Sequence, residues 1–426
     1  MSKRKVTTLV LAIALVCGLT RLATAQPTPP PSGPIVAQAF PGMPYQLVDP
    51  ANYVSPFASL FTSTRGPSTS DELDAYFQSS SRSRLLNVPE MFGDRRVSGP
   101  TILLTPVATG LPGLGAEIPV SAAISGLSVA ENNQALPSDR VWVAYNYFHN
   151  ALDVQTDTRF GAAPQNRSQS LHRTVFAFEK LLDSGRTSIE LRMPFGGAFG
   201  ADGVAGAFGA SSQYGVQGHN VGNMNLVLKR LLYAEEGFAL STGLGLEVPT
   251  GSTGLVTYGP IQASFDSQTV HFVPYVAMTQ RSGCWFGHLF TQIDFASQGD
   301  PLRVTINDTG AGDLIGRVNQ PALWGLDIGG GYWLVPPCGC NKGLALVAEL
   351  HYTTPLQDDD AFSAAGTLTT ASVNTAASPA YEVLNFTAGL QLGLGGGWQL
   401  RSGAVFPGRA EKVFDAEYLL QLNRGF

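Results

Sequence analysis

The chain ends, over residues 414–426, with the stretch FDAEYLLQLNRGF. From Phe414 to the terminal Phe426 the even-numbered positions are apolar except at Arg424, and several odd-numbered positions are polar. Successive side chains of a β-strand point to opposite faces. This ending therefore predicts a strand with one apolar face and one polar face.

The same alternation recurs upstream of this last stretch. Between Arg140 and Phe426 it marks twelve stretches, joined by connections that mostly alternate between long and short. The five short connections in even-numbered places all contain glycine, which suits tight turns with positive φ, at Gly185, Gly237, Gly283, Gly339 with Gly343, and Gly395 to Gly397. The pattern predicts an all-β fold, a closed antiparallel up-and-down transmembrane β-barrel of about twelve strands over residues 139–426.

The two faces of these strands differ in chemistry. One is predominantly apolar, as in Phe176, Phe178 and Leu191, and the other holds most of the ionisable groups. A basic side chain at the centre of a bilayer costs about 2 to 4 kcal/mol, so the ionisable face is expected to point inward. The predicted pore-lining residues are Arg173, Glu179, Glu190, Arg192, Lys229, Glu247, His271, Asp294, Asp327, Glu349, His351, Arg401, Asp415 and Glu417.

Alternation alone does not say which face is inside, because a soluble barrel or sandwich inverts the two. Aromatic residues near strand ends on the apolar face favour the membrane, as at Trp285, Tyr332, Tyr352 and Trp398. A secreted, soluble β-rich binding protein remains as an alternative class.

The first 25 residues have the features of a secretory signal peptide. Lys3, Arg4 and Lys5 precede an apolar run, and Ala23 and Ala25 supply the small residues before cleavage. The run from residue 6 to residue 19 is too short for a spanning helix, which needs about 20 residues. We expect export and cleavage before Gln26, and hence a bacterial outer-membrane location for the barrel.

Two further regions precede the barrel. Residues 26–46 are rich in proline and predict an extended tether. Residues 47–138 show a mixed pattern that fits two interpretations equally: an irregular periplasmic leader, or a plug folded into the mouth of the barrel.

Two stretches carry a resemblance to known proteins. The alternating ending, with Phe426 last, resembles the closing strand of bacterial outer-membrane barrels and implies recognition by the outer-membrane assembly machinery, although Arg424 departs from that pattern. Residues 139–148, DRVWVAYNYF, resemble the opening strand of a bacterial outer-membrane β-barrel porin family of planctomycete type, and residues 88–94, VPEMFGD, resemble a short upstream motif of that family. The resemblance implies an outer-membrane barrel and no particular substrate.

Composition and charge narrow the function. Only 14% of residues are charged, and the net charge of −6 without basic clusters beyond the signal argues against nucleic acid as a partner. Acidic residues outnumber basic ones on the polar face. We therefore expect a narrow porin or channel for passive passage of small polar solutes, with a weak cation preference and outer-membrane lipid around it. A closed structural barrel is the alternative, and a homotrimer is an open expectation.

The sequence gives little support for an enzyme or a cofactor. Outer-membrane lipases need a serine and a histidine on the outer face, but no Gly-x-Ser-x-Gly motif accompanies His172. His271, His288 and His351 belong to the polar face. We expect no catalytic residues, no cofactor and no metal.

The cysteines support one structural expectation. Removing Cys17 with the signal leaves Cys284, Cys338 and Cys340, all in short turns on the same rim, in an oxidising compartment. We expect a disulfide from Cys284 to Cys338 or Cys340, with a Cys338–Cys340 pair as the rival and one free thiol. Either bond requires Cα atoms within about 7 Å.

Overall fold

The structure is a computed structural model. It describes residues 88–94, 101–106, 114–117, 126–156, 165–198, 204–205, 211–212, 215–216, 220–251, 253–258, 261–306, 313–337, 342–357, 362–365, 369–374, 382–409, 412 and 414–426. The predicted signal peptide and tether, most of residues 47–138, Cys338 and Cys340 lie outside these ranges.

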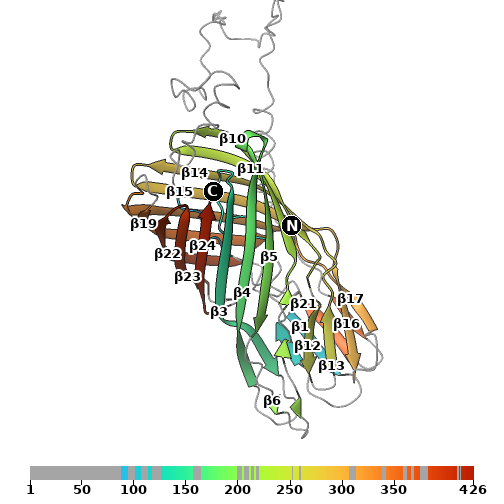
Figure 1. The fold of residues 1–426 in the computed structure, drawn as a ribbon. Coiled ribbons are helices and arrows are strands. Elements are labelled where there is room, and N and C mark those ends of the chain that lie inside the picture. The colour runs from blue at the N-terminus through green and yellow to red at the C-terminus, as the bar shows by residue number, and fades with distance from the viewer. Residues whose placement is uncertain are drawn as a thin grey trace, which may run out of the picture.

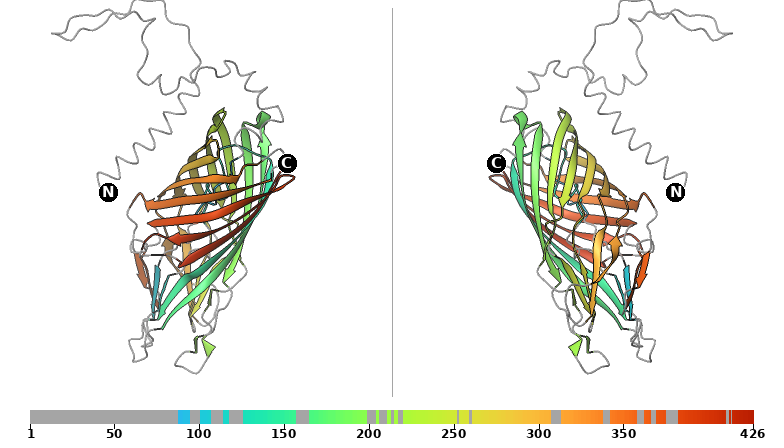
Figure 2. Two further views of the ribbon diagram at one scale, coloured as in Figure 1. Left: turned by 90° about the vertical axis from the view of Figure 1, so that its left-hand side faces the viewer. Right: turned by 90° about the vertical axis from the view of Figure 1, so that its right-hand side faces the viewer.

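Twelve antiparallel strands close into a barrel, as the sequence predicts (Figures 1 and 2). They are β3 (Arg140–Thr156), β4 (Gln165–Leu182), β5 (Thr187–Ala198), β10 (Met224–Glu235), β11 (Phe238–Val248), β14 (His271–Ser282), β15 (Trp285–Ala296), β18 (Leu323–Val335), β19 (Lys342–Pro355), β22 (Val383–Gly395), β23 (Trp398–Pro407) and β24 (Ala416–Gly425). Each pairs with the next in the chain, and β24 pairs with β3 from Ala416 opposite His149 to Gly425 opposite Arg140. Closure leaves no free edge in this ring of strands.

The two rims of the barrel differ. At one rim, the turn rim, neighbouring strands are joined by short turns, such as the 3-10 turn η3 (Asp183–Gly185) and the turn at Gly237. Gly237 has φ +82° and its Cα faces the Arg281 carbonyl, so a Cβ there would lie 2.7 Å from that oxygen. Glycine is therefore required for this turn. The barrel also begins and ends at this rim, where Phe426 N donates to Asp139 O at 3.1 Å.

At the opposite rim, the loop rim, the long connections fold into further strands (Figure 1). A five-stranded sheet has the order β17 (Asp313–Val318), β16 (Asp300–Ile306), β13 (Ile261–Phe265), β12 (Gly254–Tyr258), β8 (Gly215–Val216). Shorter pieces are β6 (Val204–Ala205), β7 (Ser211–Ser212), β9 (Asn220–Val221), β20 (Phe362–Ala365) and β21 (Thr369–Asn374). The long connections are therefore partly ordered.

Residues upstream of the barrel also reach the loop rim. Strand β1 (Thr101–Pro106) pairs with β21, and β2 (Leu114–Glu117) pairs with β1 and with the end of β3, where Leu114 lies opposite Thr156. The segments on either side of this pair, residues 88–94 and 126–138, lie inside the barrel. We call them the first and second inner segments, and together the plug.

The outward face of the barrel is apolar and exposed. Large side chains such as Phe176, Leu228 and Leu420 point away from the lumen, with 45% or more of their surface accessible. Among the described residues, no helix combines the length and the apolar character needed to cross a bilayer.

The structure changes the expectation for residues 414 and 415. The alternation predicts Phe414 on the outward face, but it is buried and packs edge-on against Phe148, with ring centroids 5.5 Å apart. The reason is that β24 starts only at Ala416, so the strict alternation does not extend to these two residues.

Candidate functional site

The site is the lumen, where the wall of the barrel meets the plug. All the predicted inner-face residues except Asp415 are buried inside the barrel. Asp415 instead lies before β24 on the exterior, 2.6 Å from the Lys412 ammonium, and it accepts a hydrogen bond from Asn150. The hydrogen bond from Lys412, followed by that from Asn150, lowers the pKa of Asp415.

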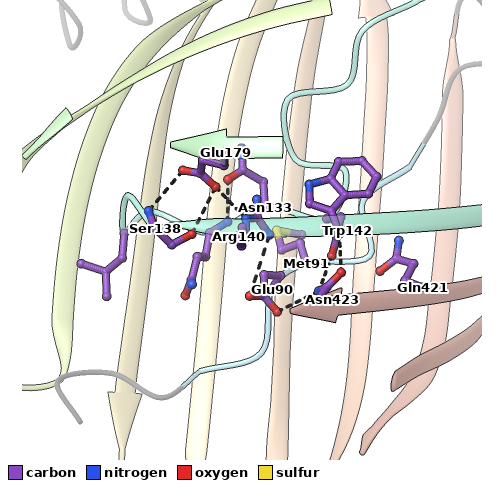
Figure 3. Close-up of polar contacts among 12 residues, drawn as sticks. Glu90, Met91, Asn133, Ser138, Arg140, Trp142, Glu179, Gln421 and Asn423 are labelled. Carbon is purple, nitrogen blue, oxygen red and sulfur yellow. Dashed lines mark hydrogen bonds and ion pairs between the residues drawn. The ribbon is translucent and has the colours of Figure 1, made fainter. Parts of the chain in front are cut away.

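The first charged cluster lies near the turn rim and is centred on Glu179 (Figure 3). Arg140 Nε lies 2.6 Å from Glu179 Oε2, and Lys229 Nζ lies 3.1 Å from Glu179 Oε1. The ammonium of Lys229 also donates to Asn133 Oδ1 of the second inner segment at 2.7 Å. All four side chains are buried. The cluster therefore joins three wall strands to the plug through charge-assisted hydrogen bonds.

The second cluster holds the middle of the second inner segment. The Arg173 guanidinium donates to both carboxylate oxygens of Glu131, with 3.0 Å for the Nη2 to Oε2 contact. Arg192 donates to the carbonyls of Ser128 at 2.9 Å and Val129 at 3.4 Å. A forked guanidinium–carboxylate contact fixes both position and orientation. The second inner segment is therefore anchored to β4 and β5.

Arg192 is itself supported from the wall. Its Nε lies 3.1 Å from Glu190 Oε1, which also accepts the indole N–H of Trp142 at 2.8 Å. The guanidinium carbon lies 5.5 Å from the centroid of the Trp142 ring, within the range of a cation–π contact. These contacts restrict the orientation of Arg192 toward the plug.

The first inner segment is held between β19 and β23. Glu349 accepts the backbone N–H groups of Phe92 at 2.7 Å and Gly93 at 2.9 Å. Arg401 donates to the carbonyls of Glu90 and Met91, with 3.2 Å for the second contact. One wall carboxylate and one wall guanidinium thus bind four successive residues of main chain.

Histidines on the inner face belong to hydrogen-bonded networks, two of them with carboxylates. His351 Nδ1 lies 2.8 Å from Asp327 Oδ1, and its Nε2 lies 3.3 Å from Glu349 Oε2. His271 Nδ1 lies 2.8 Å from Asp294 Oδ1. His288 Nδ1 contacts the Thr279 hydroxyl at 3.0 Å. Glu349 and Thr279 accept hydrogen bonds from the plug, so His351 and His288 support two of the groups that hold it.

The two inner segments also contact each other closely. Met91 N donates to Asn133 O at 2.8 Å, and Asn132 N donates to Phe92 O at 3.2 Å. Gly93 has φ +72°, and a Cβ there would lie 2.5 Å from the Cα atom of Glu131. Only glycine permits this approach without a shift of backbone. The plug is therefore a packed unit of two antiparallel segments.

Glycines on the inner face of the wall make room for the apolar side chains of the plug. A Cβ at Gly389 would lie 2.5 Å from the Phe92 ring, and one at Gly245 would lie 2.5 Å from Leu127 Cδ2. At Gly329 the corresponding distance to Met91 Cε is 3.1 Å. We call these positions the glycine sockets. Large side chains of the plug pack at wall positions that have no side chain, so the interior is closely packed.

Several lumen residues were not among the predicted ones. Arg140 and Trp142 occupy inward positions of β3, and the period-2 pattern of that strand was sufficient to find them. Glu90, Asp94 and Glu131 belong to the plug, whose irregular backbone carries no such period. The one sequence signal in that segment is the run of four polar residues at 131–134, ENNQ.

The exterior carries a small polar cluster near the loop rim. His172, which no lipase-type motif accompanies, shares a hydrogen bond of 2.6 Å with the Tyr145 hydroxyl, and the Tyr147 hydroxyl donates to Ser170 Oγ at 3.1 Å. No group of three or more potential metal ligands occurs among the residues that the structure describes.

The predicted disulfide falls partly outside the described residues. Cys284, in the turn between β14 and β15, packs against the buried apolar cluster and forms no disulfide with any residue that the structure describes. Cys338 and Cys340 are not in the described ranges, so the pairing stays a prediction.

Comparison with known proteins finds similar solved structures. An outer-membrane channel from Pseudomonas putida F1 has 15% identity and a TM-score of 0.41, covering 71% of this chain and 100% of that one. The KdgM porin in complex with disordered oligogalacturonate has 9% identity and a TM-score of 0.35, covering 67% and 99%. The toluene transporter TodX of Pseudomonas putida has 9% identity and a TM-score of 0.36, covering 67% and 87%. No family model and no curated protein matches the chain.

Proposed function

We propose that this protein is an outer-membrane β-barrel that acts as a channel for small polar solutes and is closed by its own plug. The observation that carries the proposal is the contrast between an exposed apolar exterior and a lumen wall lined with ionisable side chains that contact the plug. Each strand contributes to both surfaces.

The exterior supports a place in the membrane. A closed barrel with an apolar outer band needs a lipid environment, because exposed apolar surface of this extent is unfavourable in water. Trp285, Tyr332 and Trp398 lie exposed near the turn rim, where aromatic side chains suit the membrane–water interface. A soluble binding protein would have buried this face. Export through a cleaved signal peptide, as proposed from the first 25 residues, agrees with this location.

The lumen supports passage of polar solutes. Without the plug, the wall would present Arg173, Arg401 and Glu349 among other charged groups, and such a surface takes up water. The plug contacts these groups through hydrogen bonds, which water can replace, and its apolar side chains pack against the wall in addition. Displacement of the plug would therefore turn a closed barrel into a water-filled channel.

The wall charges support a weak cation preference. The buried wall carboxylates among the described residues outnumber the buried guanidinium and ammonium groups, even when the carboxylates of the plug are left out. The acidic set is Glu179, Glu190, Glu247, Asp294, Asp327, Glu349 and Glu417, and the basic set is Arg140, Arg173, Arg192, Lys229 and Arg401. Reversal potentials in a salt gradient measure this preference.

Planar-bilayer conductance of the full chain and its Gly93→Val variant tests the proposal. The valine would force the two inner segments apart without altering the wall. We expect the unmodified chain to be closed or to open rarely, and Gly93→Val to give stable conducting steps. Gly283→Val is the matched control, because Gly283 also has positive φ (+61°) but lies in an exposed turn where an added Cβ would meet no atom within 4 Å.

A closed structural barrel is the second candidate. It is favoured by the extent of the buried ionic network, since paired charges in a sealed interior can serve stability alone. A Gly93→Val variant that inserts into the bilayer, changes its gel mobility on heating as folded barrels do, and still gives no conducting steps would support the closed structural barrel and contradict the channel.

A further inference from the structure

The wall recognises the plug largely through its main chain. Acceptors on the wall meet N–H groups: Glu349 with Phe92 and Gly93, Glu247 with Gly126, Gln292 with Val129, and Thr279 with Ala135. Donors meet carbonyls: Arg401 with Glu90 and Met91, Arg192 with Ser128 and Val129, and Gln292 with Leu127. These atoms are common to every peptide.

The arrangement around the first inner segment is the most complete. Over residues 90–93, Arg401 donates hydrogen bonds to the first two carbonyl oxygens, and Glu349 accepts hydrogen bonds from the next two N–H groups. Both wall side chains are at least 95% buried, so these hydrogen bonds form away from water. Charge-assisted hydrogen bonds to a peptide unit are stronger than neutral ones.

The glycine sockets add places for side chains. Phe92 lies against Gly389 and Gly403, and the Arg401 guanidinium carbon is 4.2 Å from its ring centroid. Binding of an extended peptide combines main-chain hydrogen bonds for affinity with pockets for side chains for specificity. The wall from β19 to β23 provides both the main-chain hydrogen bonds and a pocket for a side chain.

We propose that the lumen wall is a binding site for short peptides, and that the first inner segment occupies it as a tethered ligand. This inference rests on the proposed channel function and names its solute class. A buried backbone must form hydrogen bonds in any protein. What distinguishes a ligand site is that a free peptide competes for the same groups once the plug is loosened.

The test uses single channels of the full chain carrying Gly93→Val. The probe is the blocked pentapeptide with the sequence of residues 90–94, EMFGD. Its matched control is the same peptide with methyl groups on the two nitrogens that correspond to Phe92 and Gly93. We expect the probe to interrupt the current, and the methylated control to need a concentration higher by about tenfold or more, as loss of hydrogen bonds to a charged group implies.

A wall variant assigns the effect to the site. Adding Glu349→Ala should abolish the difference between the two peptides, because the acceptor of both N–H groups is gone. If that variant fails to fold, Arg401→Ala replaces it and should weaken both peptides equally. Equal block by both peptides in the Gly93→Val channel overturns the peptide site while leaving the channel intact. Absence of any channel in Gly93→Val overturns the proposed function itself.

Discussion

The outer and inner faces of the same strands obey the same alternation but have different requirements. On β24, Tyr418, Leu420 and Leu422 point outward and are exposed, whereas Glu417 and Gln421 point inward and are buried. In the proposed membrane location, the outward side chains need only be apolar, because lipid chains pack against apolar side chains of any shape. The inward ones need partners with defined geometry.

This difference shows where specificity lies in the molecule. We expect exchange of Leu420 for another apolar residue to change stability little, whereas Arg173 contacts the Glu131 carboxylate in a fixed geometry. Substitutions on the two faces should therefore differ in how much they lower the free energy of unfolding. They should also differ in whether a second substitution at a contacting residue restores it.

The largest effect is expected at the Arg173–Glu131 contact. Arg173→Ala removes the forked partner of the buried Glu131 carboxylate and leaves it with the more distant Arg192, 3.9 Å away, so it should lower the free energy of unfolding by about 3 to 5 kcal/mol. Urea unfolding in lipid vesicles measures this. The double change Arg173→Met with Glu131→Leu should recover most of the loss, since no lone charge remains. Equal destabilisation by the single and double variants contradicts a specific pair.

On the outer face, the stability cost of a charged substitution should depend on the depth of the residue in the membrane. Leu420 is 48% exposed in the middle of β24, and Leu420→Arg should lower stability by about 2 to 4 kcal/mol if that position faces lipid at the midplane. Leu182→Arg is the control, because Leu182 is similarly exposed (43%) but ends β4 at the turn rim. Vesicle unfolding should show about 0 to 1 kcal/mol there. Similar values at both positions would argue against a lipid belt.

The glycine sockets give a smaller effect. Gly389→Ala places a Cβ against the Phe92 ring and should cost about 1 to 3 kcal/mol through overpacking. Combining it with Phe92→Leu should relieve part of that cost. Gly287→Ala is the comparison, because a Cβ added at Gly287 would lie 3.5 Å from the Gly329 carbonyl oxygen, an ordinary van der Waals distance. A Gly389→Ala variant as stable as Gly287→Ala would mean that Phe92 does not pack at this socket.

The smallest effect is expected outside the lumen, at Asp415 and Lys412. This pair is exposed, so Asp415→Asn should change stability by about 0 to 1 kcal/mol. Because Lys412 lowers the pKa of Asp415 in the folded chain, the contribution is present above the ordinary aspartate pKa and is lost as the pH falls through the lowered value. Unfolding of both proteins across acidic pH should show their difference vanish at the acid end.

Most of the barrel was predictable from the sequence. Period-2 alternation depends on the backbone of a strand alone, so it located the strands and their inner and outer faces. Glycines in the short connections predicted tight turns with positive φ, and Gly185 and Gly237 have such φ values. The closing strand was found in the same way.

The contacts of the lumen were not predictable in the same way. Glu349 and Phe92 are 257 positions apart, and no local pattern relates them. The plug backbone is irregular, so its residues show no period, and the sequence left open whether they form a leader or a plug. Phe414 was misplaced because alternation was extended beyond the end of the strand.

A cysteine cross-link tests most directly whether the second inner segment lies in the lumen. Asn132 Nδ2 donates to Asn423 Oδ1 at 2.8 Å. With the native cysteines replaced by serine, Asn132→Cys paired with Asn423→Cys should form a disulfide in the membrane-embedded protein and not in urea, as seen by mass spectrometry of the linked peptides. Asn132→Cys paired with Leu422→Cys, the outward neighbour on β24, should not. No link in the first pair, or equal links in both, would contradict a plug inside the barrel.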